Sequence, residues 1–351
     1  MTASDGDTIK VYDTQKGEEA HVYHSRKYGV ANVAFTHDPL AVIYSSTHVS
    51  SRGVSPAQHG CVDETTLRAS LLAPPGRRPS KPRAARALAL AHPPPRSRPA
   101  PAPPLPALQG NDHAWRYHDL HDNRYVRYFR GHTGRVTTLC QSPKTDQVLS
   151  AGEDKQVRLW DLRSGVCTAM LQAPGLPTVA FDEQGLVFCV GAESGVVKLY
   201  DARNYASGPF NTFVVEDERN SAAVFAVLRF SLDGKCLLAV VEGRIYVLDA
   251  FEGAKLCKVA SGVPDGGSAL EACLTADGRY VLSGCGDRAV RVWRVDSGAQ
   301  VAEWQPQHAD TPACLKFSPR KMLVASACRA LHLWTPDPAL RSRQQQGWPP
   351  V

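Results

Sequence analysis

A short sequence pattern returns along most of this 351-residue chain and restricts the folds that are open to it. The pattern is a β-rich run that ends in an aromatic or apolar residue followed by Asp or a substitute. Its clearest copies are V-R-L-W-D-L-R-S-G (157–165), V-K-L-Y-D-A-R (197–203), R-I-Y-V-L-D-A (244–250) and V-R-V-W-R-V (290–295). Weaker copies are I-K-V-Y-D (9–13), W-R-Y-H-D-L (115–120) and L-H-L-W-T (331–335). Such recurrence is typical of a protein built from similar modules.

The spacing of these copies gives the size of the module. The second residue of each pair falls at positions 13, 119, 161, 201, 249, 294 and 335, so the intervals are 106, 42, 40, 48, 45 and 41 residues. WD repeats, each of which forms one four-stranded blade of a β-propeller, recur every ~40 to 45 residues. Removing residues 47–108 from the long interval leaves 44. We therefore predict an all-β, seven-bladed WD-repeat β-propeller whose second blade is interrupted between its second and third strands.

Composition sets the interrupting block apart from the rest of the chain. Residues 47–108 contain 13 of the 26 prolines, 9 basic residues and 2 acidic residues. The chain outside the block has 31 basic and 32 acidic residues, so the formal charge of +6 belongs to the block and does not indicate a nucleic-acid partner. The block has no pattern that could bury a core, and we predict a disordered Pro/Arg/Ala-rich insert.

The predicted organisation has four parts. Residues 1–46 hold a partial blade one and the start of blade two, and residues 47–108 form the insert. The rest of blade two through blade seven occupies 109–335, and 336–351 is a disordered tail. Two origins remain open for the insert: an evolved loop that presents P-x-x-P-like segments, or translated intron. Its end, P-A-P-P-L-P-A-L-Q-G, is what a pyrimidine-rich tract followed by a CAG acceptor would encode.

The two ends of the predicted propeller do not match a closed ring. Only 12 residues precede Asp13, whereas a whole repeat places ~30 residues before its pair. We therefore expect an N-terminally incomplete propeller that lacks the closing N-terminal strand and the first two strands of blade one. The Pro- and Gln-rich tail is a poor substitute strand. An open seam between the first and last blades, with low stability, follows from this pattern.

The best-preserved repeat carries polar residues that we expect to be buried together. His132 precedes the first predicted strand, Ser150 ends the second, Asp154 lies in the next turn and Trp160 ends the third. In WD repeats the equivalent residues form a hydrogen-bonded tetrad, because a buried indole N–H, imidazole and carboxylate need partners where water is absent. The alternative, a Ser-His-Asp hydrolase triad, lacks the G-x-S-x-G elbow that exposes a nucleophile. A partial copy of the tetrad is Ser283, Asp287 and Trp293.

Other sequence features argue against an enzyme and against a cofactor or metal. There is no P-loop, no strand-to-helix G-x-G-x-x-G and no C-x-x-C pair among the ten cysteines. His113, His118 and His121 lie close together, but solvated turn histidines explain them better than a metal site. The acidic N-terminus is unlike a signal peptide, so we expect reduced cysteines. Several of these are expected to pack as small apolar residues in strands, namely Cys140, Cys189, Cys236, Cys273 and Cys314.

Several runs together resemble one family more closely than WD repeats in general. They are K-Y-G-V (27–30), Y-S-S (44–46), L-H-D-N-R-Y-V-R-Y-F-R-G-H (120–132), V-R-L-W-D-L-R-S (157–164), V-K-L-Y-D-A-R (197–203), G-P-F-N-T-F (208–213), L-E-A-C (270–273) and A-S-A-C (325–328). In this order they are similar to the small WD-repeat subunit of COMPASS-type (Set1-type) histone lysine methyltransferase complexes. The resemblance covers 1–46 and 109–335.

The resemblance implies a nuclear, non-catalytic scaffold. Members of that family tether the methyltransferase to RNA polymerase II by reading the serine-phosphorylated C-terminal repeat of its largest subunit. The family also serves in transcription termination assemblies that contain a protein phosphatase. Composition separately gives no reason to expect a nucleic-acid partner, and because no stretch approaches the ~18 to 20 apolar residues of a membrane span, we expect no membrane association.

One segment offers a chemical basis for phosphate recognition. Arg124, Arg127 and Arg130 alternate with Tyr125 and Tyr128. Guanidinium groups bind phosphate bidentately, and tyrosine rings suit an extended peptide. The alternative is an outer blade strand whose arginines face solvent and whose tyrosines pack between blades.

A second class of function rests on a short motif. Trp160-Asp161-Leu162-Arg163 has the form W-D-x-R, and Tyr200-Asp201-Ala202-Arg203 is a near copy. In WD-repeat proteins this form resembles the feature by which substrate receptors dock on cullin-type ubiquitin ligases. The structural alternative is that the residues after the pair form a turn. Docking would use Trp160, Asp161, Arg163, Asp201 and Arg203.

Overall fold

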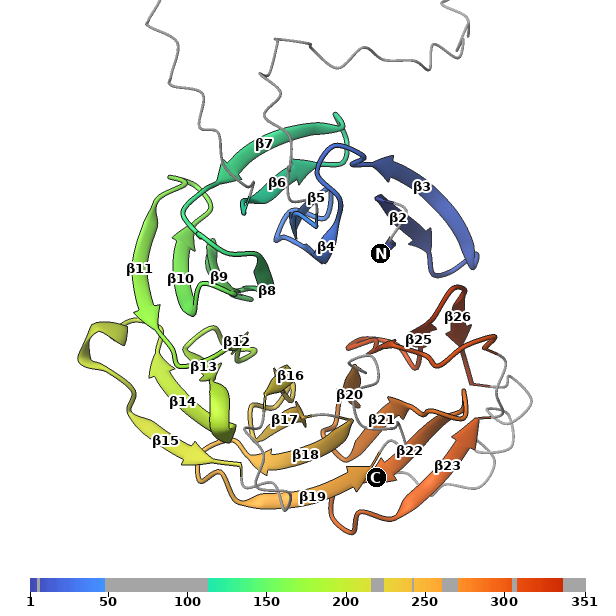
Figure 1. The fold of residues 1–351 in the computed structure, drawn as a ribbon. Coiled ribbons are helices and arrows are strands. Elements are labelled where there is room, and N and C mark those ends of the chain that lie inside the picture. The colour runs from blue at the N-terminus through green and yellow to red at the C-terminus, as the bar shows by residue number, and fades with distance from the viewer. Residues whose placement is uncertain are drawn as a thin grey trace, which may run out of the picture. The chain divides into compact units, whose positions relative to one another are not determined.

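The computed structural model describes residues 1–4, 7–47, 113–215, 224–241, 243–260, 271–304 and 308–336. Regular structure in these ranges is β-strand, apart from two short 3-10 turns, η1 (Glu193–Gly195) and η2 (Tyr205–Ser207). The strands form seven antiparallel sheets, which we call blades 1 to 7 in chain order (Figure 1). The predicted all-β, seven-bladed β-propeller is confirmed. No helix in the described part is long and apolar enough to span a membrane.

Each blade uses consecutive strands, from an inner strand to an outer one. The first four blades are β1 (Thr2–Ser4), β2 (Thr8–Asp13) and β3 (Glu18–His24); β4 (Ala31–Phe35), β5 (Ala41–Ser45), β6 (Trp115–Asp119) and β7 (Arg124–Phe129); β8 (Val136–Gln141), β9 (Gln147–Gly152), β10 (Gln156–Asp161) and β11 (Cys167–Gln172); and β12 (Thr178–Phe181), β13 (Val187–Gly191), β14 (Val196–Asp201) and β15 (Asn211–Val214). The last three are β16 (Phe225–Phe230), β17 (Cys236–Val241), β18 (Arg244–Asp249) and β19 (Lys255–Ala260); β20 (Ala272–Leu274), β21 (Tyr280–Gly284), β22 (Val290–Arg294) and β23 (Gln300–Trp304); and β24 (Cys314–Phe317), β25 (Val324–Ala327) and β26 (Leu331–Trp334).

The strands differ in burial according to their place in the blade. Second strands such as β17 are apolar and almost wholly buried, because other blades cover both of their faces. The outer strand β11 alternates between half-buried and exposed residues, as expected where one face meets a neighbouring blade and the other meets water. This gradient places the apolar core between the blades.

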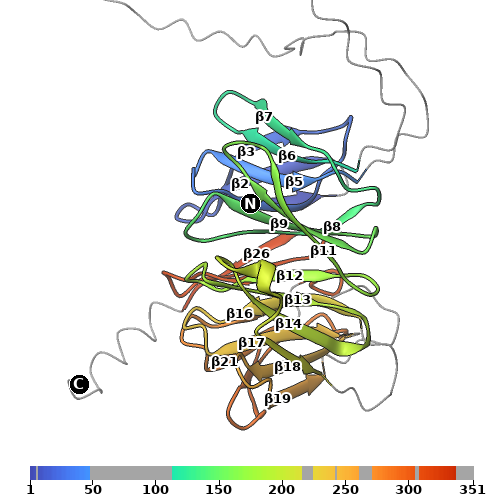
Figure 2. The same ribbon diagram turned by 90° about the vertical axis from the view of Figure 1, so that its left-hand side faces the viewer.

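The blades follow one another in chain order around the propeller (Figures 1 and 2). The core consists of six clusters of buried side chains, and each cluster joins two consecutive blades. Between blades 2 and 3, for example, Trp115 and Phe129 pack with Val148 and Trp160. The Trp115 and Phe129 rings stack at 3.7 Å, and Trp160 meets Phe129 edge-on. In the described ranges no cluster joins blade 7 to blade 1, and the open seam stays a prediction.

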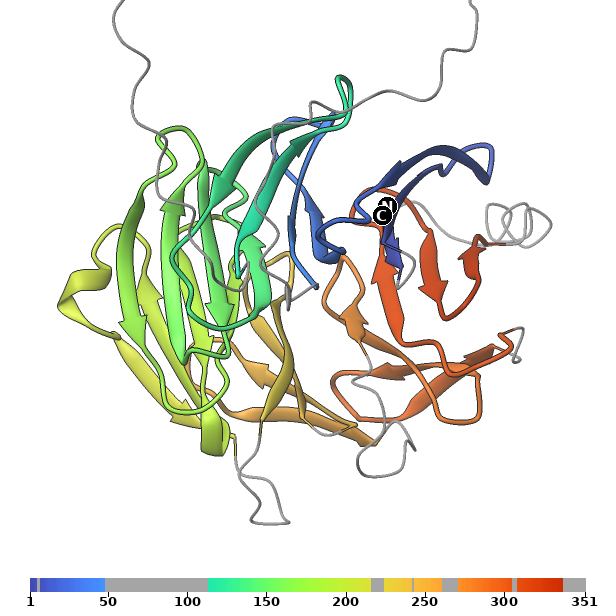
Figure 3. The ribbon, with the colours of Figure 1, turned by 45° about the horizontal axis from the view of Figure 1, so that its top comes forward.

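Blades 1 and 7 lie next to each other and each contains three described strands (Figures 1 and 3). The prediction that both of the first two strands of blade 1 are absent was wrong for one of them. β1 pairs with β2, with Thr2 opposite Lys10 and Ser4 opposite Thr8, so three residues suffice to occupy the second strand position. No strand pairs across the junction of blades 7 and 1 in the described part of the chain.

The predicted insert falls at a defined place in blade 2. β5 pairs with β6, and Ser45 lies opposite Trp115, so the two sides of the interruption meet in neighbouring strands. The chain divides into two units, 1–49 with 111–351 and 50–110. Apart from Thr47, the predicted insert 47–108 lies outside the described residues. The predicted tail 336–351 does so apart from Pro336.

Candidate functional site

The Asp of the recurring pair has the same local role in five blades. Its carboxylate accepts the backbone N–H of the residue two positions later, at 2.8 to 2.9 Å. This is an Asx turn, in which the side chain stands in for a backbone acceptor and allows the chain to reverse toward the outer strand. The five residues are Asp13, Asp119, Asp161, Asp201 and Asp249.

The W-D-x-R residues divide between the interior and the surface. Trp160 is buried between blades 2 and 3, while the Arg163 side chain is 85% exposed and pairs with Asp146. The Arg203 side chain is 74% exposed, and its Nε lies 3.7 Å from Asp201 Oδ1. The structure therefore gives Trp160 and the two aspartates structural roles and leaves two arginine side chains at the surface.

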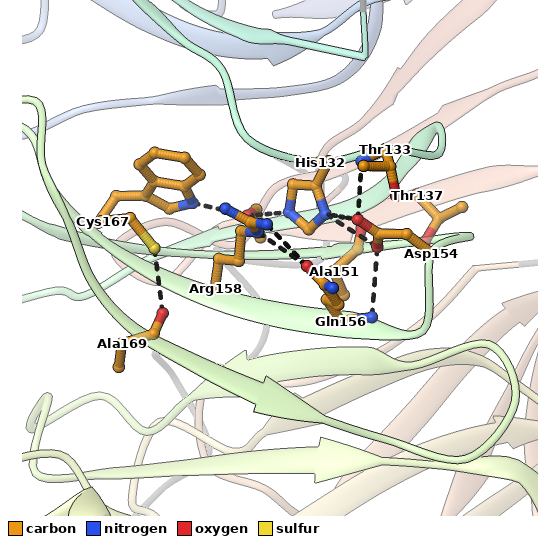
Figure 4. A network of polar contacts seen from close by, with 11 residues as sticks. His132, Thr133, Thr137, Ala151, Asp154, Gln156, Arg158, Cys167 and Ala169 are labelled. Carbon is orange, nitrogen blue, oxygen red and sulfur yellow. Dashed lines mark hydrogen bonds and ion pairs between the residues drawn. The ribbon is translucent and has the colours of Figure 1, made fainter.

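The structure brings His132, Ser150, Asp154 and Trp160 together in blade 3. Trp160 Nε1 donates to Ser150 Oγ at 2.8 Å, and Ser150 Oγ lies 2.6 Å from His132 Nε2. The other ring nitrogen, His132 Nδ1, lies 2.9 Å from Asp154 Oδ2 (Figure 4). The Asp154 carboxylate only accepts, so His132 Nδ1–H donates to it, and Nε2 of the neutral ring accepts the proton of the Ser150 hydroxyl.

The protonation states of the residues in this network suit a structural role and not catalysis. Burial lowers the pKa of the His132 imidazole more than the Asp154 carboxylate raises it. Burial on its own raises the pKa of the Asp154 carboxyl, but the Thr133 N–H and the His132 ring outweigh it and the pKa is lowered. A neutral imidazole therefore meets a carboxylate. Ser150 is fully buried and accepts the Trp160 N–H, so it is not presented to a substrate.

A second network of this kind lies in blade 7 and was missed from the sequence. Trp334 Nε1 donates to Ser326 Oγ at 2.7 Å, and Ser326 Oγ lies 2.7 Å from His308 Nε2. The signal that could have found it is the interval of 18 residues between His308 and Ser326, which equals that between His132 and Ser150. The Asp position is filled by Cys328, whose Sγ lies 3.3 Å from His308 Nδ1.

The partial copy in blade 6 has different contacts. Ser283 Oγ donates to the carbonyl of the next residue, Gly284, at 2.9 Å. Asp287 pairs with Arg291 in place of an imidazole. The position 18 residues before Ser283 lies outside the described residues.

The arginines of β7 and its following turn do not form one surface. The Arg124 guanidinium lies 3.3 Å from Asp122, and its side chain is 69% exposed. Arg127 Nη1 donates to the carbonyl of Ser164 in blade 3 at 2.5 Å, which ties the two blades together. Arg130 is exposed, and its Cζ lies 6.0 Å from the Tyr128 ring.

The tyrosines, in contrast, gather with residues from other strands. Tyr28, Tyr125 and Tyr128 have mutual ring-centroid distances of 5.3 to 6.4 Å, and Tyr128 is 40% exposed. The buried Arg116 guanidinium lies 3.6 Å from the Tyr28 ring centroid and 5.6 Å from that of Tyr128. Lys27 Nζ lies 5.1 Å from the Tyr28 ring centroid. We call these residues, with Arg130, the aromatic–arginine surface.

Tyr28 and Arg116 were missed as candidates because only the strand register brings them to this place. Arg116 of β6 lies opposite Tyr128 of β7, and a bulge separates this pairing from that of His118 with Tyr125. Burial, reinforced by Tyr28 and Tyr125, raises the pKa of Tyr128 to about 12. Its phenol therefore remains protonated at neutral pH.

The histidines near blade 2 do not all lie in solvated turns. The prediction was wrong for His118, which lies on β6, is buried and contacts Asn123 at 3.1 Å. Burial lowers the pKa of this imidazole. His121 fits the prediction, with a side chain 73% exposed. In the described residues, no group of three or more His, Cys, Asp or Glu side chains is placed to hold a metal.

The cysteines also depart from the expected pattern at one place. Cys189 and Cys273 are buried, while Cys140 and Cys236 are half-buried. Cys314, at the start of the inner strand β24, is exposed, so the prediction that it packs as a small apolar residue was wrong. Inner strands of a propeller have one end open to solvent.

Comparison with known proteins identifies WD repeats in the chain and relatives that match it along most of its length. The model "WD domain, G-beta repeat" matches residues 123–161 and 268–294. The chain is 33% identical over 338 residues to Protein ANTHESIS POMOTING FACTOR 1 of Arabidopsis thaliana, covering 96% of this chain and 83% of that protein. It is 32% identical over 338 residues to WD repeat-containing protein 82 of Drosophila melanogaster, covering 96% and 86%. COMPASS component SWD2 of Saccharomyces cerevisiae is 30% identical over 238 residues, covering 63% and 71%.

Proposed function

Because the chain belongs to the WD-repeat family of WD repeat-containing protein 82 and COMPASS component SWD2, we propose that it is a scaffold of a COMPASS-type histone lysine methyltransferase complex. COMPASS component SWD2 is by its name a component of such a complex, and we propose that the chain is likewise a non-catalytic subunit and not an enzyme. Its partner in this proposal is the catalytic methyltransferase subunit, and its place of action is the nucleus. The observation that carries the proposal is similarity along 96% of the chain.

The finer part of the proposal is that the chain tethers the methyltransferase to RNA polymerase II with a serine-phosphorylated C-terminal repeat. The aromatic–arginine surface supports it. Tyr28 and Tyr128 offer ring faces for an extended peptide, and Arg130 and Lys27 add positive charge beside them. The buried Arg116 holds Tyr28 in place, since its guanidinium stacks on that ring.

The contacts give the sequence-predicted residues different roles in this proposal. Arg130 and Tyr128 contact the phosphopeptide, and the Tyr125 ring packs against the Tyr128 ring and supports it. Arg127 positions β7 against blade 3 through the Ser164 carbonyl. Arg124 is held by Asp122 and adds charge at the edge of the surface.

Titration with synthetic repeat peptides tests this assignment. Wild-type protein should bind the serine-phosphorylated peptide more tightly than the unphosphorylated one. Arg130→Ala should weaken phosphopeptide binding by about tenfold, since a charge-assisted contact is worth about 1.5 kcal/mol. The matched control is Arg163→Ala, which removes an exposed arginine of blade 3. Equal affinity of wild type and Arg130→Ala for the phosphopeptide would contradict the assignment.

Affinity purification of the tagged chain from cells tests the scaffold itself. Recovery of methyltransferase-complex subunits supports the main proposal, and recovery of a protein phosphatase with termination factors extends it to transcription termination. The alternative is a substrate receptor of a cullin-type ubiquitin ligase, which the surface exposure of Arg163 and Arg203 favours. Recovery of the ligase adaptor, lost on replacing both arginines by Ala, would support that alternative. The proposal includes no direct nucleic-acid partner and no membrane.

A further inference from the structure

The outer strand of a blade carries a bulky hydrophobic residue at one fixed position in the register. We call it the cover residue, because it lies opposite the third strand, at the residue four positions before the recurring Asp or its substitute. Six blades share this antiparallel pairing: Tyr23 opposite Ile9, Phe129 opposite Trp115, Leu171 opposite Val157, Phe213 opposite Val197, Val259 opposite Ile245 and Trp304 opposite Val290. The six covered residues of the third strands are at most 1% exposed.

The cover residue also helps to join its blade to the next one. Its neighbour there is the residue just before the recurring Asp or its substitute. Three pairs are in ring contact at centroid distances of 5.0 to 6.2 Å: Tyr23 with His118, Phe129 with Trp160, and Trp304 with Trp334. Three others share a core cluster: Leu171 with Tyr200, Phe213 with Leu248, and Val259 with Trp293. A cover residue thus links two blades.

Blade 7 has no cover residue in the described part of the chain. Its third strand, β26, pairs with β25 on one side, and no described strand pairs with its other edge. Leu331, four positions before Thr335, is half-buried, unlike its six counterparts. Trp334 and Tyr12 are half-buried too, whereas the five counterparts of these two residues are at most 7% exposed, namely His118, Trp160, Tyr200, Leu248 and Trp293. Of these equivalent positions, the more exposed ones are therefore those that a fourth strand of blade 7 would bury.

Neither the first strand nor the residues that follow β26 match the position of a cover residue. β1 is already paired with β2. The cover residue lies ten positions after the recurring Asp or its substitute in five blades, and twelve positions after it in blade 4. Counted from Thr335, these positions hold Gln345 and Gly347, which lie outside the described residues and are not hydrophobic. The sequence around blade 7 therefore does not supply the cover residue.

We propose that the outer edge of β26 is a docking site for an extended segment of another protein, which becomes the fourth strand of blade 7. An edge strand offers backbone N–H and C=O groups to such a segment, and alternate side chains give specificity. The segment pairs antiparallel with β26 and places a bulky hydrophobic residue opposite Leu331. There the residue covers Leu331 and Tyr12, and joins blade 7 to blade 1.

Blade 6 shows which side chains such a segment needs. Its third strand contains V-R-V-W (290–293), which has the same alternation as L-H-L-W (331–334) in β26. On β23, Trp304 is the cover residue, Glu303 before it is exposed, and Ala302 before that is half-buried. The expected pattern of the segment is therefore small, polar, bulky hydrophobic. The docking site shares no residue with the aromatic–arginine surface, so its test does not depend on phosphopeptide binding.

The first test titrates the full-length protein with a peptide of residues 297–304, S-G-A-Q-V-A-E-W, with blocked ends, followed by calorimetry and hydrogen exchange. The peptide should bind, and at saturation it should slow exchange of the backbone amides of β26 at least about tenfold. Trp304→Gln in the peptide should weaken binding at least about tenfold, because burial of this side chain drives association. The matched control peptide, Glu303→Gln, changes a solvent-facing residue and should bind like the parent. No binding, or equal affinity of the parent and Trp304→Gln peptides, would overturn the proposal.

The second test changes the protein. Leu331→Gln should weaken binding of the parent peptide at least about tenfold, whereas the control Leu256→Gln, at a 45% exposed residue of β19, should leave it unchanged. If Leu331→Gln does not fold, the peptide comparison decides, since it leaves the protein unaltered. Sedimentation of the wild type should give a monomer. A dimer that the peptide dissociates would show that a second copy occupies the edge, and would overturn the assignment to another protein.

Discussion

Replacing Ser150 by Ala removes the atom that joins the two halves of the blade 3 network. Trp160 Nε1 loses its acceptor at 2.8 Å, and His132 Nε2 loses its donor at 2.6 Å. Both groups lie in the packed interior, where no water replaces the hydroxyl. A buried polar group without a partner costs about 1 to 3 kcal/mol, so two such groups should lower the free energy of unfolding by about 2 to 6 kcal/mol.

Ser283→Ala is the matched control for this change. Ser283 is as fully buried as Ser150, but its hydroxyl donates to the carbonyl of its neighbour, Gly284, at 2.9 Å. Removing the Ser283 hydroxyl takes one donor from the Gly284 carbonyl, and this loss should lower the free energy of unfolding by about 1 kcal/mol. The space left by the hydroxyl is the same in both variants. The difference between them therefore measures the network itself.

Urea unfolding of both variants, followed by tryptophan fluorescence, provides the comparison. Ser150→Ala should unfold at a lower urea concentration than Ser283→Ala, with equal slopes, and the difference should be about 2 kcal/mol. Free energies of unfolding that agree to within about 0.5 kcal/mol would refute the reasoning. The Ser150 hydroxyl, which joins two partners, would then contribute no more to stability than the Ser283 hydroxyl, which has one.

Three further outcomes follow from the described contacts. Acid should destabilise the fold below about pH 6.5, because burial lowers the pKa of the His118, His132 and His308 imidazoles from 6.5 and the unfolded chain then binds more protons. The free energy of unfolding, measured by urea titration, should fall by up to about 1.4 kcal/mol per pH unit for each histidine. Deleting residues 47–108 shortens the connection between Ser45 and Trp115 from 69 residues to 7. If the block is an unstructured insert, the smaller loop-closure entropy should stabilise the fold by about 2 kcal/mol, and a lower melting temperature would contradict this prediction. Gly284→Ala should destabilise the fold by about 1 to 3 kcal/mol in thermal melts, because the new Cβ would lie 2.2 Å from the Pro312 carbonyl oxygen of the next blade. In the control Gly208→Ala the new Cβ has no neighbour within 4 Å, so this variant should be destabilised only by the positive φ of that position.

The recurring pair predicted the blades because it marks a position with a fixed local role. Asp161 and Asp201 each accept the N–H two residues later, and this turn joins the third strand to the fourth. Since the contact spans two residues, it leaves a signature that sequence alone carries. The spacing of these turns then gave the number of blades and the place of the interruption in blade 2.

Contacts between strands were less predictable, and the aromatic–arginine surface shows why. Arg116 meets Tyr28 across 88 residues of sequence, and His118 is enclosed by residues of blades 1 and 2. A bulge between Tyr117 and His118 changes which residues of β7 lie opposite β6. Alternation of Arg and Tyr along β7 therefore did not give the face on which each side chain lies. Only the register does so.

The two polar networks show how one geometry serves different chemistry. In blade 7 the turn is shorter, with 8 residues from Ser326 to Trp334 against 10 from Ser150 to Trp160, so the spacing that identified blade 3 did not apply. Both networks nevertheless join an indole N–H, a serine hydroxyl and an imidazole, and the opposite ring nitrogen meets Asp154 in blade 3 and Cys328 in blade 7. Blade 7 is joined by an apolar cluster to blade 6 and by none of the described clusters to blade 1. It follows that breaking the network at His308 would loosen a blade that the described clusters join on one side, whereas the same loss at His132 affects a blade that they join on both sides.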